Sequence, residues 1–418
     1  MNEDLTSRQR VRKALEHKEG DRVPIDFGGM RSTGISTIAY NNLRKKLGIK
    51  NSLSRMYDFQ QQLAYPEKEV RDLFHVDVID AGQAFLADDS EWRQWELNDG
   101  SLCLIPKYID VETDDKGTVF LKNKRGLIVG KKPTTSLYVD QVYWPYSDEP
   151  SIPEKLDAGR FGDILWSVPS PPWHLDIFDD KQYELFIKTI KKLHDETDYA
   201  IMLAVGCNLF EMGTWLRRFD NFLSDIMLDK AGVERLLDKL VEGYLKNLER
   251  ILSGVKDYVD LLQFGDDLGT QQGPFVPPKI FKDIFAPRYK LMWDYVHEKS
   301  NCKVFLHSCG SIYELIPFMI EAGVDALNPV QTTTTNMEEE KLKKEFGKDV
   351  TFWGGGANTR DVLALKTPSE VKEDVKRRIQ VFGKGGGYVF NSIHNVMADV
   401  PPQNVIAMFE AAYEFGKY

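Results

Sequence analysis

The fold is decided by one repeating unit, represented by KVFLHSCGSIYELIPFMIEAGVDALN at residues 303–328. The unit begins with an apolar run that predicts a buried strand, and it continues with a helical pattern over Ile312–Ala322. It ends in a second short strand at Asp325–Asn328. Strands that alternate with helices are typical of parallel sheets, because a crossover helix carries the chain back to the start of the next strand.

The same alternation recurs along the chain. Predicted strands begin at Arg22, Val76, Ala200, Val259, Lys303, Asp325, Val350 and Gly387. Eight strands that mostly alternate with helices predict an α/β fold, a (β/α)8 or TIM barrel, formed by a single domain over residues 1–418. A doubly wound sheet is the alternative, but no G-x-G-x-x-G motif follows a strand here.

Residues 92–146 depart from this alternation. They contain short apolar runs separated by polar turns such as Asn98-Asp99-Gly100. Turns of this kind between short strands are typical of antiparallel hairpins. We therefore predict an antiparallel β-meander inserted into the barrel.

Composition restricts the class of protein. Of the 418 residues, 42% are hydrophobic and 28% are charged, which is typical of a globular protein. The net charge of -10 argues against nucleic-acid binding through a basic face. We expect no membrane span and no signal peptide, because long apolar runs are absent and Met1–Asp4 are polar. The four cysteines show no paired spacing, so we expect a cytoplasmic location.

The first candidate metal ligands are His307 and Cys309, at the end of a predicted strand. Side chains two residues apart on a strand point to the same face, so these two can face one point. Imidazole and thiolate are ligands that suit Zn²⁺. For this pair alone, a buried cysteine beside a hydrogen-bonded histidine is the simpler interpretation.

A second histidine, His394, follows the later apolar run at residues 387–390. If the two strands are neighbours in one parallel sheet, His307, Cys309 and His394 converge at one rim. Three protein ligands with one open position are typical of catalytic zinc sites. A loop histidine that hydrogen-bonds the backbone is the alternative.

Other polar residues follow the predicted strands, where active sites of TIM barrels lie. They are Arg31, Cys207, Asn208, Asp266, Asp267, Gln331 and Asn358. Asp266 and Asp267 are candidates to bind a metal or to orient a ligand histidine, and turn formation is the alternative. Gln331 and Asn328 are candidates to bind a substrate or to hold a turn. Glu211 is a further candidate for the same rim, but an exposed acid of a helix is the simpler interpretation.

Several of these motifs together resemble the uroporphyrinogen decarboxylase superfamily of (β/α)8 barrels. The similarity extends from Arg8–Val11 and Asp21–Pro24 to the His394 loop. His307 and Cys309 are similar to the His-x-Cys zinc motif of the methyltransferase branch. The distant cysteine of that motif is absent, and His394 stands in the corresponding place before Val400-Pro401-Pro402-Gln403-Asn404. The resemblance implies Zn²⁺ on His307, Cys309 and His394.

The resemblance also implies an activity and a partner. We expect a methyltransferase that moves a methyl group between a small methylated substrate and a corrinoid (methylcobalamin) carried by a separate protein. One thiolate and two neutral imidazoles leave the zinc positive, which favours an O-methyl ether as the substrate. We assign catalytic roles to Asp266 and Asp267, and substrate contacts to Arg31, Asn208 and Gln331.

Two other functions remain as alternatives. The first is decarboxylation of a tetrapyrrole or another carboxylated substrate. The Arg-Gln-x-Gly-Arg motif of the decarboxylase branch is reduced here to Arg31, although many carboxylates need several cationic partners. The second is a non-catalytic binding barrel, which the polar strand ends disfavour. The sequence does not fix the oligomeric state, and a homodimer is compatible with it.

Overall fold

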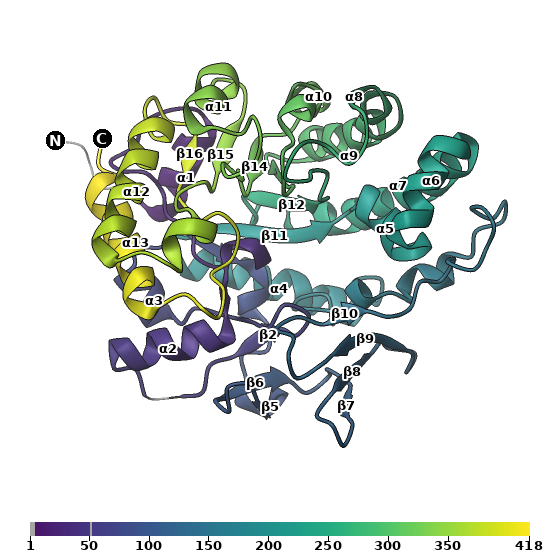
Figure 1. Cartoon of the computed structure of the whole chain (residues 1–418), viewed down its shortest axis with the longest axis horizontal. Coiled ribbons are helices and arrows are strands. Elements are labelled where there is room, and N and C mark those ends of the chain that lie inside the picture. The colour runs from purple at the N-terminus through teal and green to yellow at the C-terminus, as the bar shows by residue number, and fades with distance from the viewer. Residues whose placement is uncertain (1–4, 51) are drawn as a thin grey trace.

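A computed structural model describes residues 5–50 and 52–418 of the chain. Met1–Asp4, which entered the signal-peptide prediction, and Asn51 lie outside the described residues. The central element is a curled, parallel seven-stranded sheet in the order β16-β15-β14-β13-β12-β11-β4 (Figure 1). Its strands are β4 (Val78–Asp80), β11 (Ala200–Gly206), β12 (Leu261–Gly265), β13 (Lys303–His307), β14 (Ala326–Asn328), β15 (Thr351–Trp353) and β16 (Tyr388–Val389). This α/β architecture is TIM-like, as predicted.

The predicted first strand, which begins at Arg22, is wrong in detail, because this segment forms isolated bridges and no regular strand. Pro24 lacks the N–H group that a continuous ladder requires. The segment still hydrogen-bonds both edges of the sheet. Asp77 N donates to Ile25 O at 2.7 Å, and Phe390 N donates to Pro24 O at 2.8 Å. It therefore links the β4 edge to the β16 edge, as closure of a barrel requires.

The helices lie outside the sheet, except α1 (Figure 1). The main ones are α1 (Ser7–Leu15), α2 (Thr37–Leu47), α3 (Lys68–Leu73), α4 (Asp180–Glu196), α5 (Phe210–Arg217), α6 (Phe219–Leu228), α7 (Lys230–Val255), α9 (Ala286–Lys299), α10 (Ile316–Ala322), α11 (Glu339–Phe346), α12 (Pro368–Phe382) and α13 (Pro402–Phe415). A π-helical turn at Phe281–Phe285 directly precedes helix α9. Pro287, in the first turn of α9, cannot donate the α-helical hydrogen bond there. None of the described helices is both long and apolar enough to cross a membrane.

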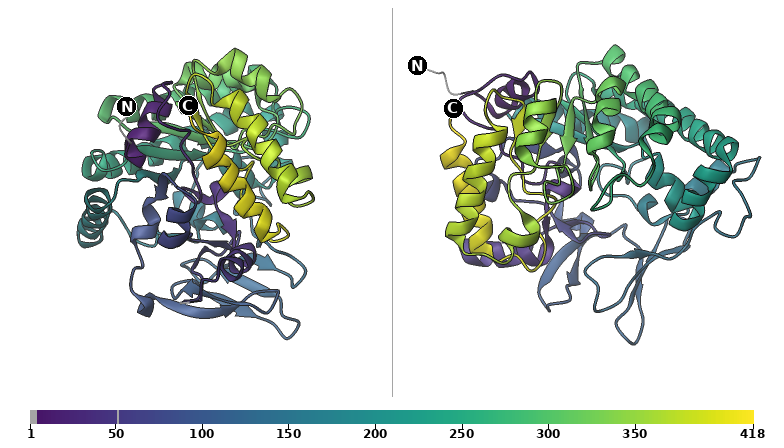
Figure 2. Two further views of the ribbon diagram at one scale, coloured as in Figure 1. Left: turned by 90° about the vertical axis from the view of Figure 1, so that its left-hand side faces the viewer. Right: turned by 45° about the horizontal axis from the view of Figure 1, so that its top comes forward.

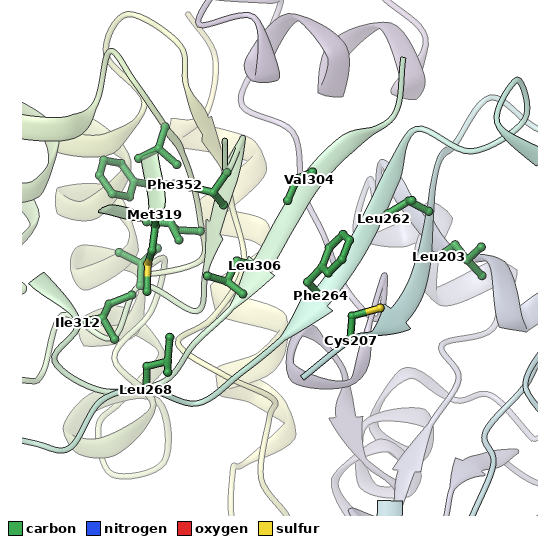
Figure 3. Close-up of a cluster of buried hydrophobic side chains, with 14 of the residues drawn as sticks. Leu203, Cys207, Leu262, Phe264, Leu268, Val304, Leu306, Ile312, Met319 and Phe352 are labelled. Atoms are coloured by element: carbon green, nitrogen blue, oxygen red, sulfur yellow. The ribbon is translucent and has the colours of Figure 1, made fainter. Parts of the chain in front are cut away.

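The two faces of the sheet have different neighbours. Outward side chains such as Phe264, Val304 and Leu306 pack with Ile312 and Met319 of the following loop and helix (Figure 3). Inward side chains form a second cluster, which includes Val11, Ala14 and Leu15 of α1 together with Met202, Leu261, Phe305, Ala326, Trp353 and Val389. Helix α1 therefore packs against the inside of the sheet, away from the carboxyl ends of the strands.

Between β4 and β11 the chain forms six antiparallel strands in two sheets. Strands β5 (Trp92–Glu96) and β6 (Leu102–Pro106) pair with each other, whereas β7 (Val111–Thr113), β8 (Val119–Lys122), β9 (Ile128–Lys132) and β10 (Asp140–Gln141) form the second sheet. The views agree that these strands gather on one side of the parallel sheet (Figures 1 and 2). They bury a separate apolar cluster that includes Cys103, Ile105 and Leu121.

Asp77 fixes the segment that links the sheet edges. Its carboxylate is fully buried and lies 2.6 Å from Arg10 Nη1 and 2.7 Å from Arg22 Nη1. It also accepts a hydrogen bond from Ile25 N at 2.8 Å. The carboxylate of Asp77, the residue directly before β4, thus binds both helix α1 and the segment that links the sheet edges.

We expect Asp77→Asn to destabilise the protein by about 3–5 kcal/mol, because the largely buried Arg22 guanidinium loses its counter-charge and Arg10 keeps only Asp21. Urea unfolding followed by circular dichroism measures this change. Asp283→Asn, which breaks an exposed pair with Lys279, is the matched control and should cost less than about 1 kcal/mol. Equal effects of the two substitutions would show that Asp77 has no special role.

Candidate metal and substrate site

His307 is the last residue of β13 and lies in register between Gly265 of β12 and Asn328 of β14. Its Nδ1 is 2.6 Å from Asn328 Oδ1 and 2.9 Å from Ser32 Oγ. Asn328 Nδ2 donates to Trp353 O at 2.9 Å, so Asn328 Oδ1 is the atom that faces the ring. Nδ1 of His307 therefore carries the proton and donates it, which leaves the Nε2 lone pair free for a metal.

The structure brings the three predicted ligands together. Cys309 Sγ lies 3.4 Å from His307 Nε2, and the ligand atoms of His307, Cys309 and His394 all lie within 4.8 Å of one another. The rings of the two histidines are 5.5 Å apart between centroids. Ligands of tetrahedral zinc, with bonds of about 2.0–2.3 Å, are separated by roughly 3.3–3.8 Å. The donor set and its spacing therefore fit Zn²⁺ with small movements of the side chains.

Two backbone features hold the ligand loops. Gly310 has φ 90°, and a Cβ atom there would lie 2.2 Å from the backbone of Gly269, so only glycine fits. Gly269 N donates to Cys309 O at 3.1 Å across this contact. His394 has φ 65°, a left-handed conformation that costs an L-residue about 1–2 kcal/mol. Ser392 Oγ donates to His394 O at 2.7 Å and stabilises that conformation.

The adjacent acids Asp266 and Asp267 occupy different environments. Asp267 Oδ1 accepts a hydrogen bond from Cys309 N at 2.8 Å and lies 3.4 Å from His307 Nε2. Asp266 is fully buried and accepts hydrogen bonds from three successive N–H groups, those of Leu209, Phe210 and Glu211, at 2.6–2.8 Å. Tyr289 Oη also donates to it. Asp267 thus lies at the candidate metal centre, whereas Asp266 anchors the N-terminus of α5.

A cavity of about 590 Å³ opens beside the three ligands, and its wall includes His307, His394 and Asp267. Of the predicted substrate contacts, Arg31 and Asn208 line this cavity. Gln331 is not part of the wall. Its Oε1 accepts a hydrogen bond from Gly310 N at 2.8 Å and so supports the Cys309 loop.

The sequence interpretation of Glu211 as an exposed acid is wrong, because Glu211 lines the cavity. Asn208 Nδ2 donates to Glu211 Oε2 at 2.7 Å. Burial, together with the carboxylates of Asp267 and Asp266, raises the pKa of Glu211 well above its ordinary value. The sequence signal for a site residue was its position in the first turn of helix α5, which follows the carboxyl end of strand β11.

Burial also sets the protonation of two candidate ligands. It raises the pKa of the Cys309 thiol well above its ordinary value, and the negative charge of Asp267 adds to this effect. Burial and the neighbouring His307 lower the pKa of His394 to about 4. Without a metal, Cys309 is therefore a thiol and His394 is a neutral imidazole at neutral pH.

Residues 173–415 match the family described as uroporphyrinogen decarboxylase (URO-D). The chain belongs to the URO-D family. One similar curated protein is the uroporphyrinogen decarboxylase of Legionella pneumophila (strain Corby). It is 28% identical to this chain over 214 residues, and the aligned region covers 50% of this chain and 55% of that protein. The enzyme of the same name from Methylococcus capsulatus (strain Bath) is 33% identical over 188 residues, 45% of this chain and 50% of that protein. The chain thus spans about half the length of these relatives.

A solved structure of a methyltransferase from Methanosarcina mazei is also similar to this chain. The likeness covers 99% of both chains, with a TM-score of 0.59 and 13% sequence identity. At this identity the likeness concerns the fold, and it extends the match beyond the residues that the family comparison covers.

We expect the apparent affinity for Zn²⁺ to rise about tenfold per pH unit between about pH 7 and pH 8.5, because binding displaces the proton of the Cys309 thiol. His394 adds no slope there, since its pKa of about 4 leaves it neutral throughout. Competition with a zinc-chelating dye measures the slope. Cys309→Ser should flatten it, whereas an unchanged slope would assign the proton to another group.

Asn328→Ala should weaken Zn²⁺ binding by about 10–100-fold, because His307 loses the acceptor that fixes its tautomer and orientation. The same dye competition measures this loss, with thermal unfolding as the check on folding. Asn221→Ala, which removes an amide bonded to Ser147 O outside the cavity wall, is the control and should keep the affinity. Unaltered binding by Asn328→Ala would contradict the role of Asn328.

Proposed function

We propose that this member of the URO-D family is a zinc-dependent methyltransferase. It takes the methyl group of a small O-methyl ether and passes it to the corrinoid of a separate protein. The convergence of His307, Cys309 and His394 at a cavity carries the proposal. The shared fold with a methyltransferase from Methanosarcina mazei supports it.

Three side chains would hold the metal: His307 through Nε2, Cys309 through Sγ, and His394 through its ring. Bound there, Zn²⁺ supplies Lewis-acid polarisation of the ether oxygen. Asn328 and Ser32 hold the His307 ring, and Asp267 holds the backbone of Cys309. These contacts fix the ligands before a metal arrives, which lowers the cost of ordering them.

The proton that the reaction needs has a source in the cavity. Methyl transfer breaks the carbon–oxygen bond, and the oxygen keeps the electron pair and takes up a proton. A reduced Co(I) corrinoid supplies the electron pair of the new bond to the methyl carbon. The raised pKa of Glu211 favours its protonated form, and Asn208 Nδ2 holds its carboxyl group in the cavity wall. We assign the proton to Glu211, the positioning of helix α5 to Asp266, and the support of the ligand loop to Asp267 and Gln331.

The second candidate is a decarboxylase, which the names of the curated relatives favour. The charges of the cavity argue against a substrate with many carboxylates. Among the described residues that line it, Arg31 and Lys124 carry positive charge. Arg31 is already neutralised by Asp58, at 2.5 Å, and Arg31 Nη2 donates to Ser170 Oγ at 3.0 Å. Incubation with uroporphyrinogen separates the two functions, and release of carbon dioxide would favour the decarboxylase.

We expect the purified protein to bind about one Zn²⁺ per chain, and His307→Ala, Cys309→Ala and His394→Ala each to lose it. With a methylated phenol and a reduced corrinoid protein, the wild type should transfer the methyl group, as followed by corrinoid absorbance, and these variants should not. His297→Ala is the control. His297 Nε2 lies 2.7 Å from the carboxylate of Asp325, the residue before β14, and neither residue is part of the cavity wall. A folded, metal-free and active wild type would refute the proposal.

A further inference from the structure

Aromatic side chains make up an unusual part of the cavity wall. Three of the eight tryptophans of the chain, Trp166, Trp173 and Trp215, line it, and all three are half-buried. Indole rings that line a cavity offer apolar surface that a ligand ring can cover. The wall therefore offers flat apolar surface next to the polar groups around His307.

These rings are held in place. Trp166 and Trp215 lie 5.5 Å apart between centroids, at 32° to each other. Gln141 Nε2 donates to Trp215 O at 2.8 Å, which ties helix α5 to strand β10. Trp173 Nε1 donates to Ala204 O at 2.7 Å. A wall fixed in this way loses little conformational entropy when it binds a flat ligand.

The charges near these rings disfavour a charged ligand. The Arg31 guanidinium lies 5.7 Å from the Trp166 ring centroid, so a cationic methylammonium donor at this ring would meet a charge of the same sign. An anionic donor meets a guanidinium already neutralised by Asp58, together with the carboxylate of Asp267 in the same wall. An uncharged donor avoids both conflicts.

Resting on the function proposed above, we infer that the cavity recognises its methyl donor through an uncharged aromatic ring stacked on Trp166 and Trp215. The substrate class is the aryl methyl ether. Methanol leaves the indole faces uncovered and most of the cavity of about 590 Å³ unfilled. Trp166 is the specificity-determining residue, because it lies beside both Trp215 and Arg31.

Isothermal titration of the full chain with 1,2-dimethoxybenzene, without corrinoid, tests the inference. We expect saturable binding that Trp166→Ala weakens by about tenfold or more and that Trp166→Phe largely restores. Trp95→Ala is the matched control, since Trp95 is also half-buried but packs on Phe59 outside the cavity wall. An equal loss with Trp95→Ala, or equally tight binding of methanol or trimethylamine, would overturn the inference.

The same titration, together with the zinc-binding and methyl-transfer measurements described above, separates this inference from the proposed function. A protein that binds the ring but takes up no zinc and transfers no methyl group supports the aromatic site and refutes the methyltransferase. A protein that takes up zinc and demethylates methanol but does not bind the ring refutes the aromatic site alone.

Discussion

The candidate site depends on the register of three neighbouring parallel strands. Gly265, His307 and Asn328 pair across β12, β13 and β14, and each is the last residue of its strand. The alternation of a strand directs His307 to the same face as Phe305, which packs inside the sheet. A shift of one residue would turn the imidazole outward to the helices and move the amide of Asn328 away from it. The hydrogen bond between His307 and Asn328 therefore forms only when these strands pair in the correct register.

Adjacent acids show how one short loop serves two purposes. Asp266 binds the three N–H groups at the start of α5, and Asp267, the next residue, binds the N–H group of Cys309. The first contact places Glu211 at the cavity and the second places the thiol. Helix α5 and the Cys309 loop are thus fixed to each other through one dipeptide, although they are far apart in the sequence.

Much of the fold and part of the site could be predicted from the sequence, for a physical reason. Buried strands and amphipathic helices are local patterns, so the segments that became β11 to β16 were visible, as was the convergence of His307, Cys309 and His394. The irregular segment at Arg22 was not, because Pro24 prevents a full ladder while tertiary hydrogen bonds keep the segment extended. The environments of Glu211, Asp266 and Gln331 depend on partners more than 20 residues away in the chain. No local pattern carries that information.

Two of the three tryptophans in the cavity wall and the candidate metal ligands belong to different parts of the chain. His307, Cys309 and His394 follow strands of the parallel sheet, whereas Trp166 and Trp173 lie on the connection between β10 and α4. Loops of this kind tolerate insertion and replacement far better than barrel strands do. Exchange of this connection would therefore change the aromatic part of the cavity wall and leave the candidate metal ligands in place. Laboratory grafting of this connection between family members offers the same route to new substrates.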